Sequence, residues 1–252
     1  MFSLPDPLTF DAWLYAWARA CAGTTCGGVS FGFVNSLLIL VPSLVMTVSI
    51  ASVTGYALAL WKVRWANGYL FVLFVCAFVP LQVIMFPLII LSGPGVLVPF
   101  TSLKVGLGTF GTTFGVAIVH TLLSLPLVTL IFRNFFSGVP SEITSAAMID
   151  SGNFWVMFFE IVLPLTKNIM IVVLIMMVTN IWNDFLIGLS FGGSGSQPMT
   201  VILNTIARTT TGEVNYPVIM AAALLTALPP LAAYFVLGKY FVQGVTAGAI
   251  KG

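Results

Sequence analysis

The sequence FVNSLLILVPSLVMTVSIASVTGYALAL, residues 33–60, decides the fold class because it contains no Asp, Glu, Lys, Arg or His. A helix needs about 20 predominantly apolar residues to cross the hydrocarbon core of a bilayer, and this stretch exceeds that length. Four further stretches share its apolar character and span-like length: 69–92, 112–132, 168–190 and 217–238. We therefore predict an all-α membrane protein with five transmembrane helices.

The composition of the whole chain argues against a soluble globular protein. Of its 252 residues, 59% are hydrophobic and 6% are charged, and the mean hydropathy is +1.10, whereas a soluble domain carries about 25% charged residues. The net charge is +2 without any run of Lys or Arg, so we expect no nucleic-acid partner. Cys21, Cys26 and Cys76 lack the spacing of a zinc site or a disulfide framework. We expect Cys21 and Cys26 to be unrelated thiols rather than a bridge.

Residues 1–31 differ from the spans because they mix aromatic, charged and proline residues without a signal-peptide pattern. We expect an extracytoplasmic segment with an interfacial helix there, followed by one membrane domain over 32–252. The loops on alternate sides of the five spans carry six and three basic residues. Because cytoplasmic loops hold the excess of Lys and Arg, we predict that 61–68, 133–167 and the C-terminus are cytoplasmic.

The segment RNFFSGVPSEITSAAMIDSGNFWVMFFEIVLPLTKN, residues 133–168, lies between the third and fourth spans and is not itself a span. Pro and Ser at 140 and 141 predict a helix start. Four residues then fall on one face at helical spacing: Ile143, Ala146, Ala147 and Asp150. Residues 151–153 break this helix, and a second helix is predicted over 154–163, ended by Pro164. The result is a helical hairpin whose small alanines leave room for another protein; packing only on its own bundle is the alternative.

Five motifs along the chain resemble one family. P-x-E-I-x-x-A-A-x-I-D begins at Pro140, and F-x-x-I-V-L-P-L follows at 158–165. The others are IWNDFLIGL at 181–189, MAAALLTALPPL at 220–231 and KYFVQGVTAGAIKG at 239–252. Together they resemble the EAA loop and later segments of permeases from binding-protein-dependent ABC importers of the carbohydrate branch. The resemblance implies a type I ABC importer permease fold, which usually has six spans, so the first span is expected to be absent or truncated here.

The resemblance implies that the hairpin is the coupling helix, which contacts a cytoplasmic ATPase subunit. The implied coupling residues are Glu142, Ser145, Ala146, Ala147, Ile149, Asp150, Ser151 and Gly152. Ser145 stands where the family has the glutamate of its EAA triplet, so we expect Glu142 to supply the acidic contact. Ser151 stands where a glycine is usual, and we expect Gly152 to keep the turn. The C-terminal family motif contributes Gly244, Thr246, Gly248 and Lys251.

No P-loop of the type G-x-x-x-x-G-K-[ST] occurs in the chain, so we expect no ATPase site, no enzyme activity and no cofactor or metal. The single histidine, His120, has no Cys, Asp or Glu near it in sequence and is interpreted as a packed structural residue. ATP and Mg²⁺ would be bound by a partner. The implied partners are a second permease subunit, two ABC ATPase subunits and an extracytoplasmic sugar-binding protein, assembled in the lipid of the inner membrane.

Asp184 is the only acidic residue within a predicted span, where a charge costs about 2.5–3.5 kcal/mol. With Asn180, Trp182 and Asn183 it is a candidate to line a sugar pathway; a buried helix-packing motif is the alternative. The segment SQPMTVILNTIARTTTG at 196–212 resembles glucose or mannose permeases, which implies a monosaccharide. Competing functions are a transporter driven by a proton or sodium gradient, which the lack of paired repeats disfavours, and a structural membrane subunit.

Overall fold

The computed structural model of the chain describes residues 9–23, 25–61, 63–97, 104–150, 152–208 and 215–249. The helices are α1 (Asp11–Ala18), α2 (Gly28–Leu60), α3 (Ala66–Ala77), α4 (Leu81–Ser92), α5 (Thr113–Ser137), α6 (Ser141–Asp150), α7 (Phe154–Val156), the π-helix η1 (Met157–Val162), α8 (Leu163–Leu165), α9 (Lys167–Trp182), α10 (Leu186–Phe191), α11 (Met199–Arg208) and α12 (Tyr216–Ala249). Two short antiparallel hairpins pair β1 (Cys21–Ala22) with β2 (Thr25–Cys26) and β3 (Val96–Leu97) with β4 (Lys104–Val105).

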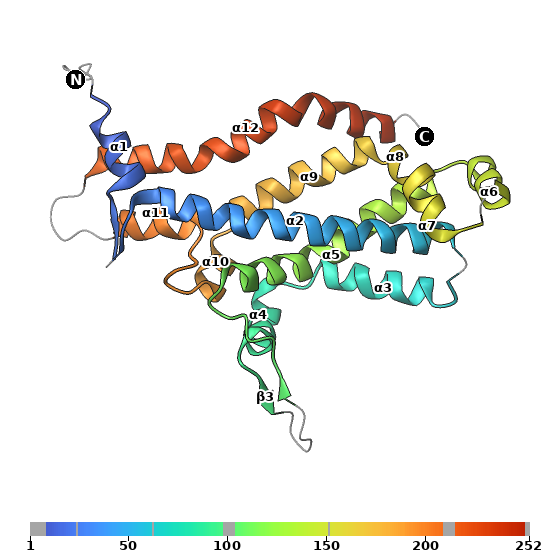
Figure 1. Cartoon of the computed structure of the whole chain (residues 1–252), viewed down its shortest axis with the longest axis horizontal. Helices are drawn as coiled ribbons and strands as arrows, with labels where there is room; N and C mark the ends of the chain where they lie inside the picture. Colours follow the sequence, from blue (N-terminus) through green and yellow to red (C-terminus); the bar gives the residue numbers. More distant parts are fainter. Residues whose placement is uncertain are drawn as a thin grey trace.

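Four long helices, α2, α5, α9 and α12, form the body of the molecule and run along its long axis (Figure 1). Among the described elements, α2 and α5 make the most extensive contact. Small and hydroxyl-bearing residues permit their close approach: Gly55 of α2 abuts Phe132 of α5, and Ser43 Oγ donates to the Ala117 carbonyl at 3.2 Å. Membrane helices pack through residues of this kind because lipid offers no hydrophobic gain for bulkier contacts.

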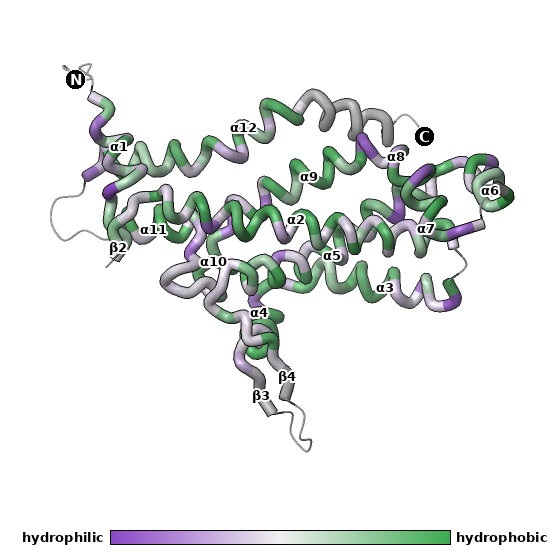
Figure 2. The backbone as a smooth tube through the Cα atoms, in the orientation of Figure 1, coloured by the Kyte–Doolittle hydropathy of each residue, from purple (hydrophilic) through white to green (hydrophobic). Residues whose placement is uncertain are grey.

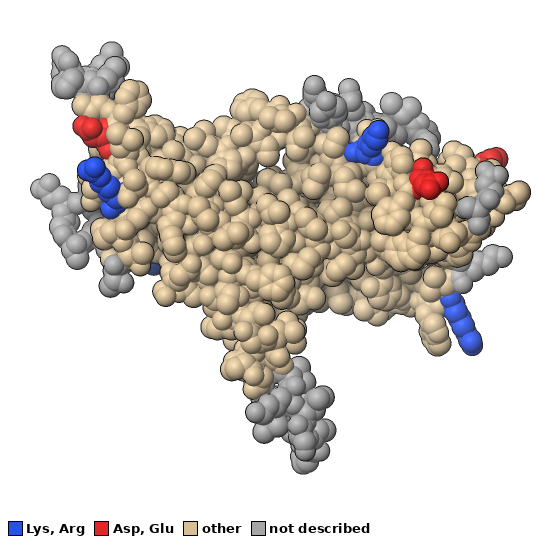
Figure 3. All heavy atoms as spheres, in the orientation of Figure 1, with Lys and Arg blue, Asp and Glu red and all other residues tan. Residues whose placement is uncertain are grey.

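The long helices are apolar along most of their length (Figure 2). On the face drawn in Figure 3, charged side chains gather toward the two ends of the long axis and leave the broad middle free of them. Within the described residues, α2, α5 and α12 are each long and apolar enough to cross a bilayer, and two bent helix pairs raise the number of spans to as many as five. This agrees with the predicted all-α membrane protein of five spans.

The predicted span over 69–92 is wrong as a single helix. The structure divides it into α3 and α4, which are bent by 104° at the break between them. Pro80 lies at this break and has no N–H to continue the hydrogen-bond ladder of α3. α4 therefore points away from the bundle and leads to the β3–β4 hairpin (Figure 1).

The helix predicted over 168–190 also ends early. α9 stops at Trp182, residues 183–185 form a break, and α10 begins at Leu186. At its other end, α9 follows the segment Phe154–Leu165 at an angle of 76°. Pro164 does not end the hairpin helix as predicted, since α8 includes it at its first turn, where proline is tolerated.

The expectation that Cys21 and Cys26 are unrelated thiols is wrong. They form a disulfide across the β1–β2 hairpin, whose register sets the two residues directly opposite each other. Gly23, with φ of +64°, adopts the left-handed conformation that lets the chain reverse within so few residues. The helix expected in this segment is confirmed as α1, which packs against α2 and α12.

Candidate functional site

The helical hairpin predicted after the third span is confirmed, and α6 with the segment from α7 to α8 lies at one end of the bundle (Figure 1). Gly152 has φ of +57°, which agrees with its expected place in the turn. Asn153 caps the next helix, because its side-chain oxygen accepts hydrogen bonds from Trp155 N at 2.9 Å and Val156 N at 3.3 Å. The Asp150 side chain and Ser151 lie outside the described residues.

α6 has one buried face and one free face. Ala147 is 3% exposed and belongs to the core, where α6 packs on η1. The opposite face exposes four of the predicted coupling residues at positions i, i+3, i+4 and i+7: Glu142, Ser145, Ala146 and Ile149. Ile149 is 85% exposed. The expectation that Ala146 and Ala147 share the free face is wrong, because η1 packs against the side of α6 that carries Ala147 and leaves Ala146 exposed.

An aromatic cluster behind the hairpin joins it to α2 and α5. Tyr56 of α2 is fully buried, and its hydroxyl donates to the Phe154 carbonyl at 3.2 Å. The centroid of the Tyr56 ring lies 4.7 Å from that of Phe154, 5.3 Å from Phe158 and 6.2 Å from Phe136 of α5. Aromatic pairs of this kind add about 0.5–1.5 kcal/mol each beyond the area that they bury. The hairpin is thus fixed to two of the long helices.

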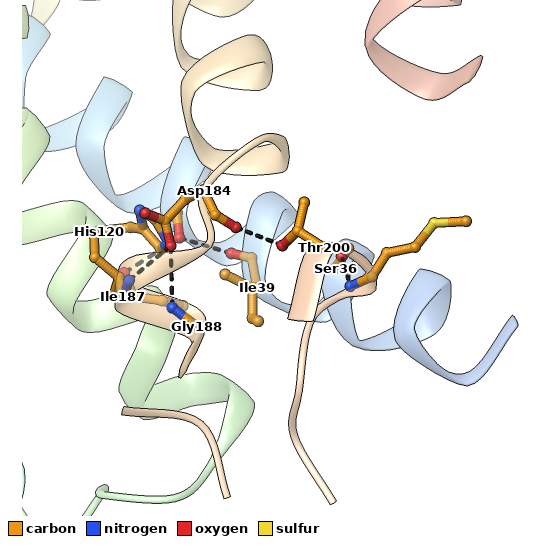
Figure 4. A network of polar contacts seen from close by, with 10 residues as sticks. Ser36, Ile39, His120, Asp184, Ile187, Gly188 and Thr200 are labelled. Atoms are coloured by element: carbon orange, nitrogen blue, oxygen red, sulfur yellow. Dashed lines mark hydrogen bonds and ion pairs between the residues drawn. The ribbon is translucent and has the colours of Figure 1, made fainter. Parts of the chain in front are cut away.

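A second polar region lies at the break between α9 and α10 (Figure 4). Asp184 Oδ2 accepts hydrogen bonds from Ile187 N and Gly188 N, both at 3.0 Å, and so caps the start of α10. The Asp184 carbonyl accepts from Thr200 Oγ1 at 2.6 Å, which ties the break to α11. A short polar side chain that bonds to nearby backbone N–H groups offers an alternative to continuing the helix. Asp184 therefore ends one helix and begins another.

His120 of α5 points toward Asp184, and its Nε2 lies 3.7 Å from Asp184 Oδ2 (Figure 4). The imidazole is buried, with 6% of the residue exposed. Sequence reasoning did not pair these residues because they lie on different predicted spans. One signal was available: ionisable groups placed in apolar spans usually pair with one another.

A cavity of about 570 Å³ lies beside this pair, between the bent pair α3–α4, α5 and the end of α9. Asn180 and Asp184, two of the four predicted pathway residues, lie on its wall together with His120. Trp182 instead points into the bundle, where it is 1% exposed and its Nε1 donates to the Thr226 carbonyl at 3.0 Å. Asn183 is exposed and is not part of the cavity wall. The four predicted pathway residues therefore do not form one site.

The C-terminal family motif contributes no described side chain to either region. Gly244, Thr246 and Gly248 lie within α12, in the stretch whose side chains are outside the described part, and Lys251 lies beyond it. Among the described residues, no three His, Cys, Asp or Glu side chains cluster in a way that would hold a metal ion.

Residues 48–247 match the profile of the family described as binding-protein-dependent transport system inner membrane component. The chain is 36% identical over 165 residues to a probable ABC transporter permease protein of Pyrococcus horikoshii, a match that covers 65% of this chain and 59% of the relative. It is 30% identical over 256 aligned positions to the alpha-glucoside transport system permease protein AglG of Rhizobium meliloti, covering 100% of this chain and 63% of AglG. The match thus spans less than two thirds of either relative.

The fold is also found among solved structures. One of them is the crystal structure of a bacterial ABC transporter involved in the import of the acidic polysaccharide alginate, with a TM-score of 0.73 and 16% sequence identity. The similarity covers 94% of this chain and 81% of that chain. At this level of identity it supports the helical-bundle architecture and says nothing about the ligand.

Proposed function

The chain belongs to the family of inner membrane components of binding-protein-dependent transport systems, and from this premise we propose that it is the permease subunit of an ATP-driven sugar importer. Members of this family are the membrane components of transport systems, so the chain is a multi-pass permease subunit and not an enzyme. In the proposed assembly it works with a second permease subunit, two ABC ATPase subunits and an extracytoplasmic sugar-binding protein.

The free face of α6 is the observation that carries this proposal. Ile149 exposes 85% of its surface at the end of the bundle, next to Ala146, while Ala147 on the opposite face anchors the helix to η1. A large aliphatic side chain beside a small residue suits insertion into a pocket of another protein, with the small residue allowing close approach. We assign this face, with Glu142 and Ser145 at its polar border, to contact with the ATPase subunit.

The proposed orientation puts α6 and the C-terminus in the cytoplasm. The charge asymmetry of the loops supports it, and so does the Cys21–Cys26 disulfide. This disulfide lies at the opposite end of the bundle from α6 (Figure 1), and disulfides persist mainly outside the reducing cytosol. The two criteria are independent and agree.

For the substrate, we propose a class of molecule and not a single compound. The relative AglG is named for alpha-glucoside transport, and a sugar is the substrate class that we propose for this chain. Asn180 and Asp184, on the wall of the cavity, supply an amide and a carboxylate of the kind that hydrogen-bond to sugar hydroxyls. The monosaccharide specificity predicted from residues 196–212 stays a narrower hypothesis, to be tested with glucose against maltose.

The proposal is tested by reconstituting the chain with its partner permease, ATPase and binding protein in liposomes and measuring the uptake of radiolabelled glucose and maltose. We expect uptake that requires ATP. Uptake that continues on a proton or sodium gradient without ATP would replace the proposal with a secondary transporter. No uptake in any assembly would favour a structural subunit.

The docking face is tested with Ile149→Asp. Loss of a side chain that anchors the centre of an interface costs about 2 kcal/mol or more, and an unpaired buried charge adds a desolvation penalty. We therefore expect at least roughly tenfold weaker capture of the ATPase and a matching loss of uptake. Val63→Asp is the matched control, because Val63 is an aliphatic residue that is 43% exposed and not on α6. It belongs to the connection between α2 and α3, which lies at the same end of the bundle as α6 (Figure 1). Equal ATPase capture by wild type and Ile149→Asp would refute the assignment.

A further inference from the structure

The His120–Asp184 pair is the one close contact between ionisable side chains on the cavity wall, within the described part of the chain. It joins α5 to the break between α9 and α10. A histidine that only fills space inside a bundle would be covered by apolar neighbours on all sides. His120 instead borders a cavity of about 570 Å³ while it approaches a carboxylate.

Thr121, the next residue on α5, is also polar and buried but does not border the cavity. Its hydroxyl donates back to the Ala117 carbonyl of its own helix at 2.8 Å. α5 thus turns the imidazole of His120 toward the cavity but not the hydroxyl of Thr121, so Thr121 provides a buried polar comparison that faces elsewhere.

The charged groups on the cavity wall restrict the charge that a ligand can carry. The described wall contains one carboxylate, Asp184, and one imidazole, His120, but no Lys or Arg; the remaining wall is mostly aliphatic, with Asn180 and Ser124 as further polar side chains. A second carboxylate brought beside Asp184 would meet no positive guanidinium or ammonium group to offset the repulsion. Neutral hydroxyl groups, by contrast, can donate to the carboxylate and bond with the imidazole.

The volume of the cavity agrees with a small ligand, since sites of about 300–1,000 Å³ hold drug-sized molecules and are mostly apolar with a few polar groups that fix orientation. The aliphatic wall suits the C–H faces of a sugar ring, and the polar groups are confined to one side.

From this juxtaposition we infer that His120 and Asp184 together form a binding station for the hydroxyl groups of a neutral saccharide, and that uronic acids are disfavoured there. The inference rests on the proposed sugar-import function. It adds His120 as a residue that contacts the sugar, and it specifies that the sugar is uncharged. In this station the backbone N–H groups of Ile187 and Gly188 orient the carboxylate. The carboxylate accepts hydrogen bonds from the sugar, and the imidazole contacts a further hydroxyl. No covalent step is involved.

The test uses the complete transporter in lipid nanodiscs and in liposomes, with radiolabelled glucose, maltose and glucuronate as probes. His120→Leu removes the polar group, His120→Gln keeps a hydrogen-bonding side chain, and Asp184→Asn removes the charge. Thr121→Val is the control for a buried polar change on the same helix. The readouts are sugar binding to the complex without the binding protein, uptake, basal ATP hydrolysis and recovery of assembled complex.

We expect His120→Leu to weaken binding of the imported neutral sugar at least roughly tenfold, the scale of leaving a buried sugar hydroxyl without its hydrogen-bond partner. His120→Gln is expected to recover most of the lost binding. The control Thr121→Val is expected to keep both sugar binding and basal ATP hydrolysis within about twofold of wild type. Wild type is expected to bind glucuronate at least roughly tenfold more weakly than glucose, and Asp184→Asn is expected to narrow that gap.

Three outcomes would overturn the inference: unchanged binding in His120→Leu, an equal loss in Thr121→Val, or a glucose-to-glucuronate ratio that Asp184→Asn leaves unaltered. If His120→Leu fails to assemble, His120→Gln and Asp184→Asn still decide, because the selectivity ratio is measured on assembled complex. A wild-type complex that imports neither neutral sugar would instead contradict the proposed function itself.

Discussion

Gly55→Ala tests whether the close contact between α2 and α5 holds the bundle together. A Cβ added at Gly55 would lie 2.8 Å from Phe132 Cβ and 2.9 Å from Arg133 N. Neither neighbour can turn aside, since one atom is backbone and the other is the first side-chain carbon of a fully buried residue. The two helices must therefore move apart, and overpacking of this kind costs about 1–3 kcal/mol.

Gly68→Ala supplies the matched control. Gly68 lies within α3 and a Cβ there would meet nothing within 4 Å. Both variants gain the helix propensity of alanine over glycine, about 1 kcal/mol, so this gain cancels in their difference. The remaining difference, about 1–3 kcal/mol, is the packing penalty. For a chain of this size it corresponds to melting temperatures that differ by roughly 2–12 °C.

The measurement is the thermal unfolding of each variant in detergent, followed as the loss of the monodisperse peak on size-exclusion chromatography after heating. We expect the melting temperature to fall in the order Gly68→Ala, wild type, Gly55→Ala, or at least Gly55→Ala below Gly68→Ala. Equal melting temperatures for the two variants, or a more stable Gly55→Ala, would show that the α2–α5 approach is not tight at this point.

Two further predictions concern the ends of the bundle. Tyr56→Phe removes the hydroxyl that donates to the Phe154 carbonyl, so we expect a loss of about 1 kcal/mol in stability and, in the assembled transporter, less uptake per ATP hydrolysed; unchanged thermal stability and an unchanged uptake-to-hydrolysis ratio would contradict it. Because Cys21 and Cys26 are bridged, a polyethylene glycol maleimide added to the unreduced, denatured protein should modify Cys76 alone and should modify all three cysteines after reduction. Replacing both bridged cysteines with Ser should cost about 2 kcal/mol for a loop this short, and labelling of all three cysteines without reductant would disprove the bridge.

The positions of the membrane helices could be predicted from the sequence because hydropathy depends on composition alone. The angles at which consecutive helices bend could not be predicted in this way. Residues 69–92 are continuously apolar, yet the chain turns by 104° near Pro80. Pro87 and Pro126 lie inside α4 and α5 without ending them. A proline marks a weak point in the hydrogen-bond ladder, and packing against neighbouring helices decides whether the helix breaks there.

The hairpin could be predicted in more detail, since its boundaries depend on local chemistry. Gly152 supplies the left-handed turn and Asn153 the cap, and both functions can be recognised from residue type. Which alanine faces inward could not be predicted, because Ala146 and Ala147 are chemically the same. Only the position of η1 beneath α6 decides that Ala147 is buried.

The pairing of His120 with Asp184 joins residues of two successive predicted spans, which the hairpin separates in the sequence. α5 carries both His120 and Phe136, which are sixteen residues apart, or about 24 Å along the helix axis. Phe136 contacts Tyr56 in the cluster beneath the hairpin, while His120 borders the cavity. One helix thus connects the proposed ATPase-docking end to the proposed sugar station. A displacement of the hairpin that moves Phe136 must be transmitted past Pro126, the one residue within this stretch of α5 that lacks a backbone N–H. We therefore expect the flexibility of α5 at Pro126 to limit how much hairpin movement reaches the His120–Asp184 contact.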